Sequence, residues 1–164
     1  MAIAEEEVTD VLPSQPGRDI FLGRKVIEMN IKRFILAAFV VFFMYQITDA
    51  IIHILILVEE YRAITIWRKN ILSTFWILYI TSFIFSFIFV YIFIRGYEGK
   101  GILEGLRYGV LIGLFVNIPY VFNQYALYPL NFSLAIKWFV LGMIQIILCG
   151  VVTALVYEPK EEIP

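Results

Sequence analysis

The residues of this sequence best suited to proton chemistry are an acid and an imidazole spaced one helical turn apart. Asp49 and His53 are separated by four positions, and Gln46 precedes Asp49 by three. Residues three and four apart share one face of a helix, so the three side chains would form a single polar stripe. An aspartate beside a histidine can relay a proton, or both can hydrogen-bond a lipid head group or a quinone.

The same stripe has two other interpretations. Polar side chains in an apolar helix can form a structural clasp that fixes helix packing, with hydrogen bonds worth about 0.6 to 2 kcal/mol each. A metal site is the third, but Asp49 and His53 supply only two ligands, and the sequence has one cysteine and no second histidine. We therefore expect neither a bound metal nor a cofactor.

Three further amides, Asn117, Asn123 and Gln145, belong to the same candidate site. When the midpoints of the apolar segments are set at one depth, Gln46, Asn117 and Gln145 coincide, and Ser82 lies near the centre of the second segment. Hydrocarbon offers no hydrogen-bond partner to such groups. We expect them to turn inward and to bond to one another.

These residues are carried by four long apolar segments. The 164 residues are 61% hydrophobic and 16% charged, with a mean hydropathy of +0.84, which excludes a water-soluble domain. A helix needs about 20 apolar residues to cross a hydrocarbon core of about 30 Å. The segments are 34–58, 71–94, 108–127 and 133–157. We predict an all-α integral membrane four-helix bundle, in which Pro119 kinks the third helix.

Small residues on the last two segments predict where helices approach closely. Glycines recur at every fourth position around the start of the third segment, and the fourth segment has a similar narrow side. Helix backbones approach closely across such stripes. The stripe would face a helix of the same chain, which a bundle needs first, or a second copy. The packing glycines are Gly101, Gly105, Gly109, Gly113, Gly142 and Gly150.

The basic residues predict an orientation. Four spans place both termini on one side, and nine of the 13 Lys and Arg residues fall on that side. They are Arg18, Arg24, Lys25, Lys32, Arg33, Arg95, Lys100, Arg107 and Lys160. Since cytoplasmic flanks are enriched in Lys and Arg, we predict a protein integral to the cytoplasmic (inner) membrane with both termini in the cytoplasm. Arg95, Lys100 and Arg107 would contact anionic lipid head groups.

The two ends of the chain differ in composition from the spans. Residues 1–28 begin acidic and are broken by two prolines, so they cannot bury enough apolar surface to fold alone. We interpret them as a flexible or interfacial tail, or as an upstream extension ahead of a start at Met29. Residues 29–159 would form the four-span domain and residues 160–164 a short C-terminal tail.

Two motifs after the second segment carry a resemblance to a family. They are the glycine-rich turn GYEGKG at 96–101 and the helix opening GLRYG at 105–109, followed by a proline-containing turn before the last segment. With MNIKRFILAAF ahead of them, they resemble a group of small bacterial four-transmembrane-helix proteins of unknown function. The similarity runs from about Met29 to Pro159. It implies the fold and the membrane placement, supports a start at Met29, and implies no activity.

Several activities are excluded by the sequence. A net charge of −1 offers no basic surface for nucleic acid. Cys149 lies in an apolar run, where a thiol stays neutral and unreactive. A P-loop ending at Gly99-Lys100 would need glycine at Ile94 and serine or threonine at Gly101. We therefore do not expect an enzyme.

The remaining prediction is a non-enzymatic membrane protein. It would be an accessory, assembly or structural subunit of a membrane complex, or a self-associating bundle, so its partners are the lipid bilayer and either further copies or a larger complex. The alternative is a small transporter of protons, ions or small molecules, which would work as an oligomer through Asp49 and His53.

Overall fold

The computed structural model describes residues 29–64, 70–157 and 159. Within these residues the chain is all-helical and contains no strand. Four helices are long and apolar enough to cross a membrane: Ile31–Ile56, Leu72–Arg95, Ile102–Leu127 and Phe132–Val156. The prediction of an all-α four-helix membrane bundle is therefore confirmed. The N-terminal tail predicted for residues 1–28 and the C-terminal tail predicted for residues 160–164 lie outside the described residues.

The helices follow the predicted segments, with one interruption and one extension. Their bounds are α2 Ile31–Ala50, a π-helix Ile51–Ile56, α3 Val58–Arg62, a 3₁₀ turn Ile71–Thr74, α4 Phe75–Arg95, α5 Ile102–Leu127 and α6 Phe132–Val156. The interruption is the π-helix, which lies in the first span. The extension is in the third helix, which begins at Ile102 rather than at 108 and so includes Glu104 and Arg107 in its first two turns. It continues through Pro119, where the sequence predicts a kink.

Local signals set the helix ends. The side-chain oxygens of Asn30 and Asn131 accept first-turn backbone N–H groups at 3.2 and 3.0 Å, and so begin α2 and α6. The turn between α4 and α5 depends on Gly99 and Gly101, whose φ angles are +77° and +62°. Residues with a Cβ rarely adopt this left-handed region, so glycine closes the turn at little cost.

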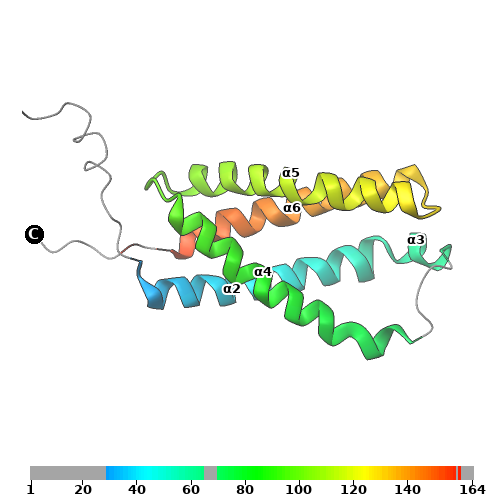
Figure 1. Ribbon diagram of the computed structural model, residues 1–164, viewed down its shortest axis with the longest axis horizontal. Coiled ribbons are helices and arrows are strands. Elements are labelled where there is room, and N and C mark those ends of the chain that lie inside the picture. Colours follow the sequence, from blue (N-terminus) through cyan, green and yellow to red (C-terminus); the bar gives the residue numbers. More distant parts are fainter. Residues whose placement is uncertain (1–28, 65–69, 158, 160–164) are drawn as a thin grey trace, which may run out of the picture.

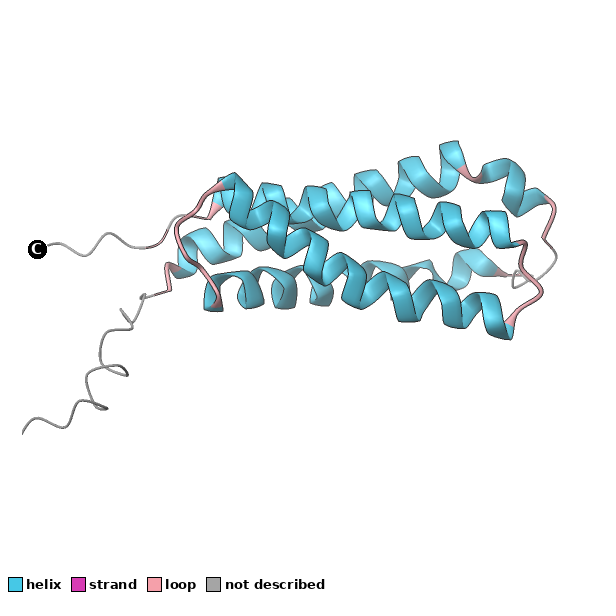
Figure 2. Ribbon diagram, turned by 90° about the horizontal axis from the view of Figure 1, so that it is seen from above, coloured by secondary structure: helices cyan, strands magenta, loops and turns pink. Residues whose placement is uncertain are grey.

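The helices are arranged as a bundle with two distinct ends. α5 and α6 lie side by side, α2 packs against both α6 and α4, and α4 crosses α2 obliquely (Figures 1 and 2). The start of α2, the α4–α5 turn and the end of α6 gather at one end, which we call the terminal end. The short helix α3 and the turn between α5 and α6 lie at the other, which we call the α3 end.

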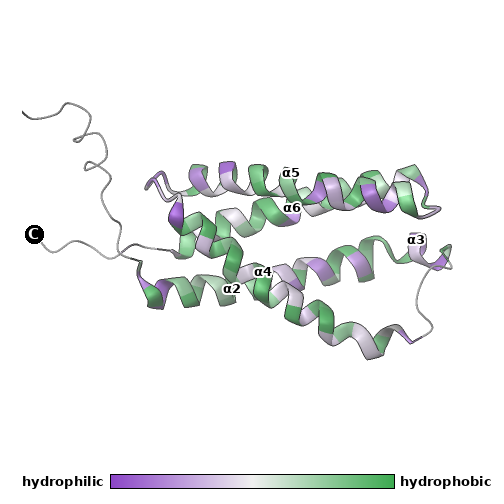
Figure 3. Cartoon of the chain, viewed as in Figure 1, coloured by the Kyte–Doolittle hydropathy of each residue, from purple (hydrophilic) through white to green (hydrophobic). Residues whose placement is uncertain are grey.

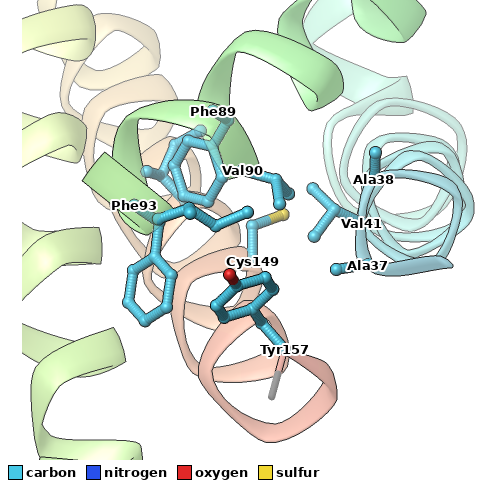
Figure 4. Close-up of a cluster of buried hydrophobic side chains, with 10 residues drawn as sticks. Ala37, Ala38, Val41, Phe89, Val90, Phe93, Cys149 and Tyr157 are labelled. Atoms are coloured by element: carbon cyan, nitrogen blue, oxygen red, sulfur yellow. The ribbon is translucent and has the colours of Figure 1, made fainter. Parts of the chain in front are cut away.

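The core of the terminal end is apolar. Small residues of α2 there meet rings of α4 and the inner face of α6 (Figure 4). The labelled members are Ala37, Ala38, Val41, Phe89, Val90, Phe93, Cys149 and Tyr157. Apolar residues also cover much of the outer surface of the four helices (Figure 3), as expected of helices that face lipid.

The closest approach in the bundle is between α5 and α6. A Cβ added to Gly105 would lie 2.4 Å from the carbonyl oxygen of Gly150, and one added to Gly109 would lie 2.7 Å from the Cα of Ile147. Both distances are far below van der Waals contact. The glycines therefore let the two backbones touch, and the partner of the stripe is a helix of the same chain.

The other predicted packing glycines differ from these two. Gly113 faces the flexible side chain of Met143, whose sulfur lies 3.0 Å from an added Cβ, and Gly142 makes room for the amide of Asn117. Gly101 has no heavy atom within 4 Å of an added Cβ, so the prediction that it packs is wrong. It precedes the helix rather than lying within it, and its positive φ serves the turn.

Candidate functional site

Asp49 and His53 lie on one face of the first span, where α2 meets the π-helix. The Nε2 atom of His53 is 3.6 Å from Oδ1 of Asp49. Neither side chain is enclosed: the exposed fractions are 42% for His53 and 39% for Asp49. The predicted pair is thus formed, and both side chains stay partly exposed.

The π-helix brings a third residue to this pair. The backbone N–H of Leu57 donates to the carbonyl of Ile52 at 2.9 Å, five residues earlier, which shifts the register of everything that follows. Tyr61 then stacks on His53, with ring centroids 5.7 Å apart and planes 13° apart. The Tyr61 hydroxyl lies 2.5 Å from Nδ1 of His53.

The hydrogen bonds at Tyr61 fit one neutral tautomer of His53. The indole N–H of Trp138 can only donate, and it donates to the Tyr61 oxygen at 2.8 Å. When His53 is neutral and has no proton on Nδ1, Tyr61 donates its own proton to that nitrogen. A neutral imidazole then carries its proton on Nε2, the nitrogen that faces Asp49. Burial raises the pKa of Tyr61, and the charge of Asp49 raises it further, so the phenol remains a donor.

A fourth helix completes this group through Tyr120 of α5. Its side chain is 58% exposed, and its hydroxyl lies within electrostatic range of Asp49. We use the name α3-end polar site for Asp49, His53, Tyr61, Trp138 and Tyr120. These five residues come from α2, the π-helix, α3, α6 and α5, so the site exists only in the folded bundle.

Two ion pairs flank the α3-end polar site. Lys137 of α6 binds the carboxylate of Glu60 in α3, and this hydrogen bond lowers the pKa of Glu60. Arg62 binds Glu59 at 2.7 Å within α3. The first pair ties α3 to α6 across the end of the bundle. Both cations are therefore matched by glutamates and not by Asp49.

The predicted mid-depth amides bond separately and not to Asp49. Gln46 accepts a hydrogen bond from Ser82 at 3.0 Å, which links α2 to α4. Gln145 donates to the backbone carbonyl of Tyr45 at 3.1 Å, which links α6 to α2. Asn117 donates to a carbonyl of its own helix at 2.9 Å. None of the three amides bonds to Asp49 or to another of the three.

Asn123 lies apart from all of these residues. It is exposed on α5, and no hydrogen bond joins it to the other described residues of the candidate site. The expectation of one shared network is therefore not met within the described chain. The reason is geometric, since α5 packs mainly on α6 and hardly touches α2.

The basic residues of the α4–α5 turn are engaged with an acid. Lys100 and Arg107 bind the two carboxylate oxygens of Glu98 at 2.6 and 2.8 Å, while Arg95 is exposed. Both cations lower the pKa of Glu98. Because its folded pKa lies below its unfolded value, Glu98 stabilises the turn at neutral pH, and that contribution is lost on acidification.

Glu104, in the first turn of α5, binds the backbone of the same turn. This residue is not identified from the sequence alone. Its side chain is only 4% exposed, and its two oxygens accept the backbone N–H groups of Glu98 and Lys100 at 2.6 and 2.9 Å. A cavity of about 260 Å³ lies beside it, between α4 and α5, and is also lined by Arg107 and Leu111. Glu104 thus acts as a clamp on the turn.

Glu104→Gln is expected to lower the free energy of unfolding by about 1 kcal/mol. The amide keeps one acceptor oxygen but turns an NH₂ group toward the second backbone N–H, so one charge-assisted hydrogen bond is lost. Thermal unfolding followed by circular dichroism in detergent measures the effect. Glu98→Gln, an exposed carboxylate of the same turn, is the control and should cost less. Equal losses would contradict the clamp.

The described residues contain no group of three His, Cys, Asp or Glu side chains that could hold a metal ion. Cys149 is fully buried among apolar side chains. The chain matches no family model, no curated protein and no solved structure.

Proposed function

We propose that the protein is a non-enzymatic membrane subunit that associates with a partner in the bilayer, either a further copy or another member of a complex. One observation carries this proposal: Asp49 and His53 stay about two-fifths exposed on an apolar helix. Gln46, Asn117 and Gln145 instead find hydrogen-bond partners within the bundle. Polar groups that face hydrocarbon are costly, and an associating surface would relieve that cost.

The close contact of α5 with α6 supports a bundle that folds before it associates. The glycines at this contact are occupied within the chain, so they are not free to join two copies. Association would therefore use the polar face of α2 and the π-helix. This places the proposed interface at the α3-end polar site.

Native mass spectrometry from lipid nanodiscs tests the proposal. The wild-type protein is expected as an oligomer or with a co-purifying protein. The double variant Asp49→Leu with His53→Leu should be monomeric, because an apolar face no longer needs cover. Phe43→Leu with Ile47→Leu, two residues 59% exposed on the same helix, is the matched control and should associate as the wild type does.

Two results would overturn this function. The first is a wild-type protein that stays monomeric in nanodiscs and after cross-linking in native membranes. The second is an unchanged association in the Asp49 and His53 double variant. Either result would mean that lipid or water, and not a protein partner, covers the polar face.

A second candidate function is an oligomeric transporter of protons, ions or small molecules. It is favoured by a chain of three titratable groups, in which His53 lies 3.6 Å from Asp49 and 2.5 Å from the hydroxyl of Tyr61. The core at the terminal end is apolar in one copy, so any path would have to form between copies. Proton flux into proteoliposomes that Asp49→Asn abolishes, with the fold retained, would favour this candidate over the first.

We further propose that the terminal end lies in the cytoplasm and that the membrane is the inner membrane of a bacterium. The support is the distribution of basic residues and the resemblance to small bacterial four-span proteins. Contact of Lys100 and Arg107 with lipid head groups would require them to leave Glu98, whereas Arg95 needs no such exchange. Reporter fusions after Gly99 and Tyr128 should report opposite sides of the membrane, and the same side for both would refute this orientation.

A further inference from the structure

The carboxylate of Asp49 has no full positive charge beside it among the described side chains. Its ion-pair partner is His53, which is charged only when protonated and which, as a neutral imidazole, accepts the Tyr61 proton at Nδ1. Among the described cations of the α3 end, Arg62 and Lys137 are bound to Glu59 and Glu60. Beside a neutral His53, an ionised Asp49 therefore carries a negative charge that no described cation pairs with, on a side chain that is 39% exposed.

The surroundings of this charge are aromatic. His53 and Tyr61 stack at 5.7 Å, and the rings of Tyr61 and Trp138 lie 6.3 Å apart at 56°. Tyr120 adds a fourth ring that is 58% exposed. The faces of such rings attract cations, most strongly where water is excluded.

A carboxylate among aromatic rings selects a particular class of cation. A metal ion demands several oxygen, nitrogen or sulfur ligands, and the described residues offer no group of three. A lipophilic organic cation, such as a quaternary ammonium or phosphonium, is weakly hydrated and needs only one counter-charge and apolar contacts. Such a cation also partitions into a bilayer, which the helix that carries Asp49 and His53 is long and apolar enough to cross.

We propose that the α3-end polar site binds a lipophilic organic cation, with its charge beside Asp49 and its apolar groups against Tyr61, Trp138 and Tyr120. The site is formed by one copy of the chain, so the proposal goes beyond the proposed function and does not depend on association, although a partner and a cation would compete for the same face. The two proposals are distinguished by a protein that binds the cation without associating, or that associates without binding the cation.

Binding of tetraphenylphosphonium to the purified protein in detergent tests this inference by isothermal titration calorimetry. We expect saturable binding of one cation per chain and at least a tenfold loss of affinity in Asp49→Asn. Asp49→Glu keeps the charge and should retain most of the affinity. Glu59→Gln removes a carboxylate from the same end and should change nothing. Tetraphenylborate, which has the same shape and the opposite charge, should not bind at the site.

A second measurement uses the wild-type protein and is independent of how the variants fold. Dicyclohexylcarbodiimide modifies carboxyl groups in apolar surroundings, and mass spectrometry locates the modified residue. Tetraphenylphosphonium should slow the modification of Asp49 and leave that of Glu59 unchanged. Equal affinities for wild type and Asp49→Asn, equal binding of tetraphenylborate, or no protection of Asp49 would each overturn the proposal.

Discussion

Alanine at Gly105 or Gly109 is expected to destabilise the bundle by about 3 kcal/mol, the largest loss from any single added methyl group in α5. The methyl group would lie 2.4 Å from the Gly150 carbonyl oxygen in the first case and 2.7 Å from the Ile147 Cα in the second. Both obstacles are backbone atoms, which cannot rotate away. The helices must separate, and the contacts along α5 and α6 weaken together.

Gly113→Ala is the matched control for this prediction. The closest atom to an added Cβ there is the sulfur of Met143, at 3.0 Å, and a thioether can change rotamer, while the Cβ of Ile146 lies at an ordinary contact distance of 3.6 Å. Its loss should be below about 1 kcal/mol. Unfolding in detergent, followed by loss of helical circular dichroism, ranks the three variants. If Gly113→Ala were as damaging as Gly105→Ala, the explanation by backbone contact would be wrong.

The sequence predicts the glycine stripe, but it does not predict how much stability is lost when each glycine is replaced. Spacing of four residues places Gly105, Gly109 and Gly113 on one side of a helix, whatever that side faces. Which glycine meets backbone and which meets a side chain depends on the register of α6, where Gly150 and Met143 happen to lie opposite. No pattern within α5 contains that information.

The α3-end polar site could be predicted only in part. The spacing of Asp49 and His53 places them together in any helix, and the structure has them 3.6 Å apart. Tyr61 follows His53 by eight residues, which an uninterrupted α-helix would rotate about 80° from the face of His53. The π-helix changes that register, and the sequence of Ile51–Ile56 contains no proline or glycine from which the change could be predicted.

The prediction of a shared amide network is wrong because equal depth in the membrane does not make two side chains neighbours. Gln46, Asn117 and Gln145 lie near the midpoints of their segments in the sequence, but each bonds within its own helix or to the neighbouring one. Sequence gives the height of a residue in a span and leaves its direction around the helix axis to packing. In this bundle α2 touches α4 and α6, so its amide finds Ser82 first.

Tyr61→Phe is expected to lower the free energy of unfolding by about 2 kcal/mol, because two hydrogen bonds share the lost hydroxyl. The indole N–H of Trp138 loses its acceptor and Nδ1 of His53 loses its donor, while the ring stack is kept. The same change frees His53 to move its proton from Nε2 to Nδ1. Unfolding in detergent measures the first effect, and nitrogen chemical shifts of the imidazole report the second.

Tyr125→Phe provides the control, since Tyr125 is a 39% exposed tyrosine of α5 that packs edge-on against Phe132, and its hydroxyl has no hydrogen-bond partner among the described residues. Its stability should change by less than about 0.5 kcal/mol. If the hydroxyl of Tyr61 sets the tautomer, only Tyr61→Phe will alter the imidazole shifts and move the Trp138 indole resonance. An unchanged imidazole in Tyr61→Phe would mean that Asp49 alone fixes the proton on Nε2, and the neutral state of His53 would then rest on Asp49 and not on Tyr61.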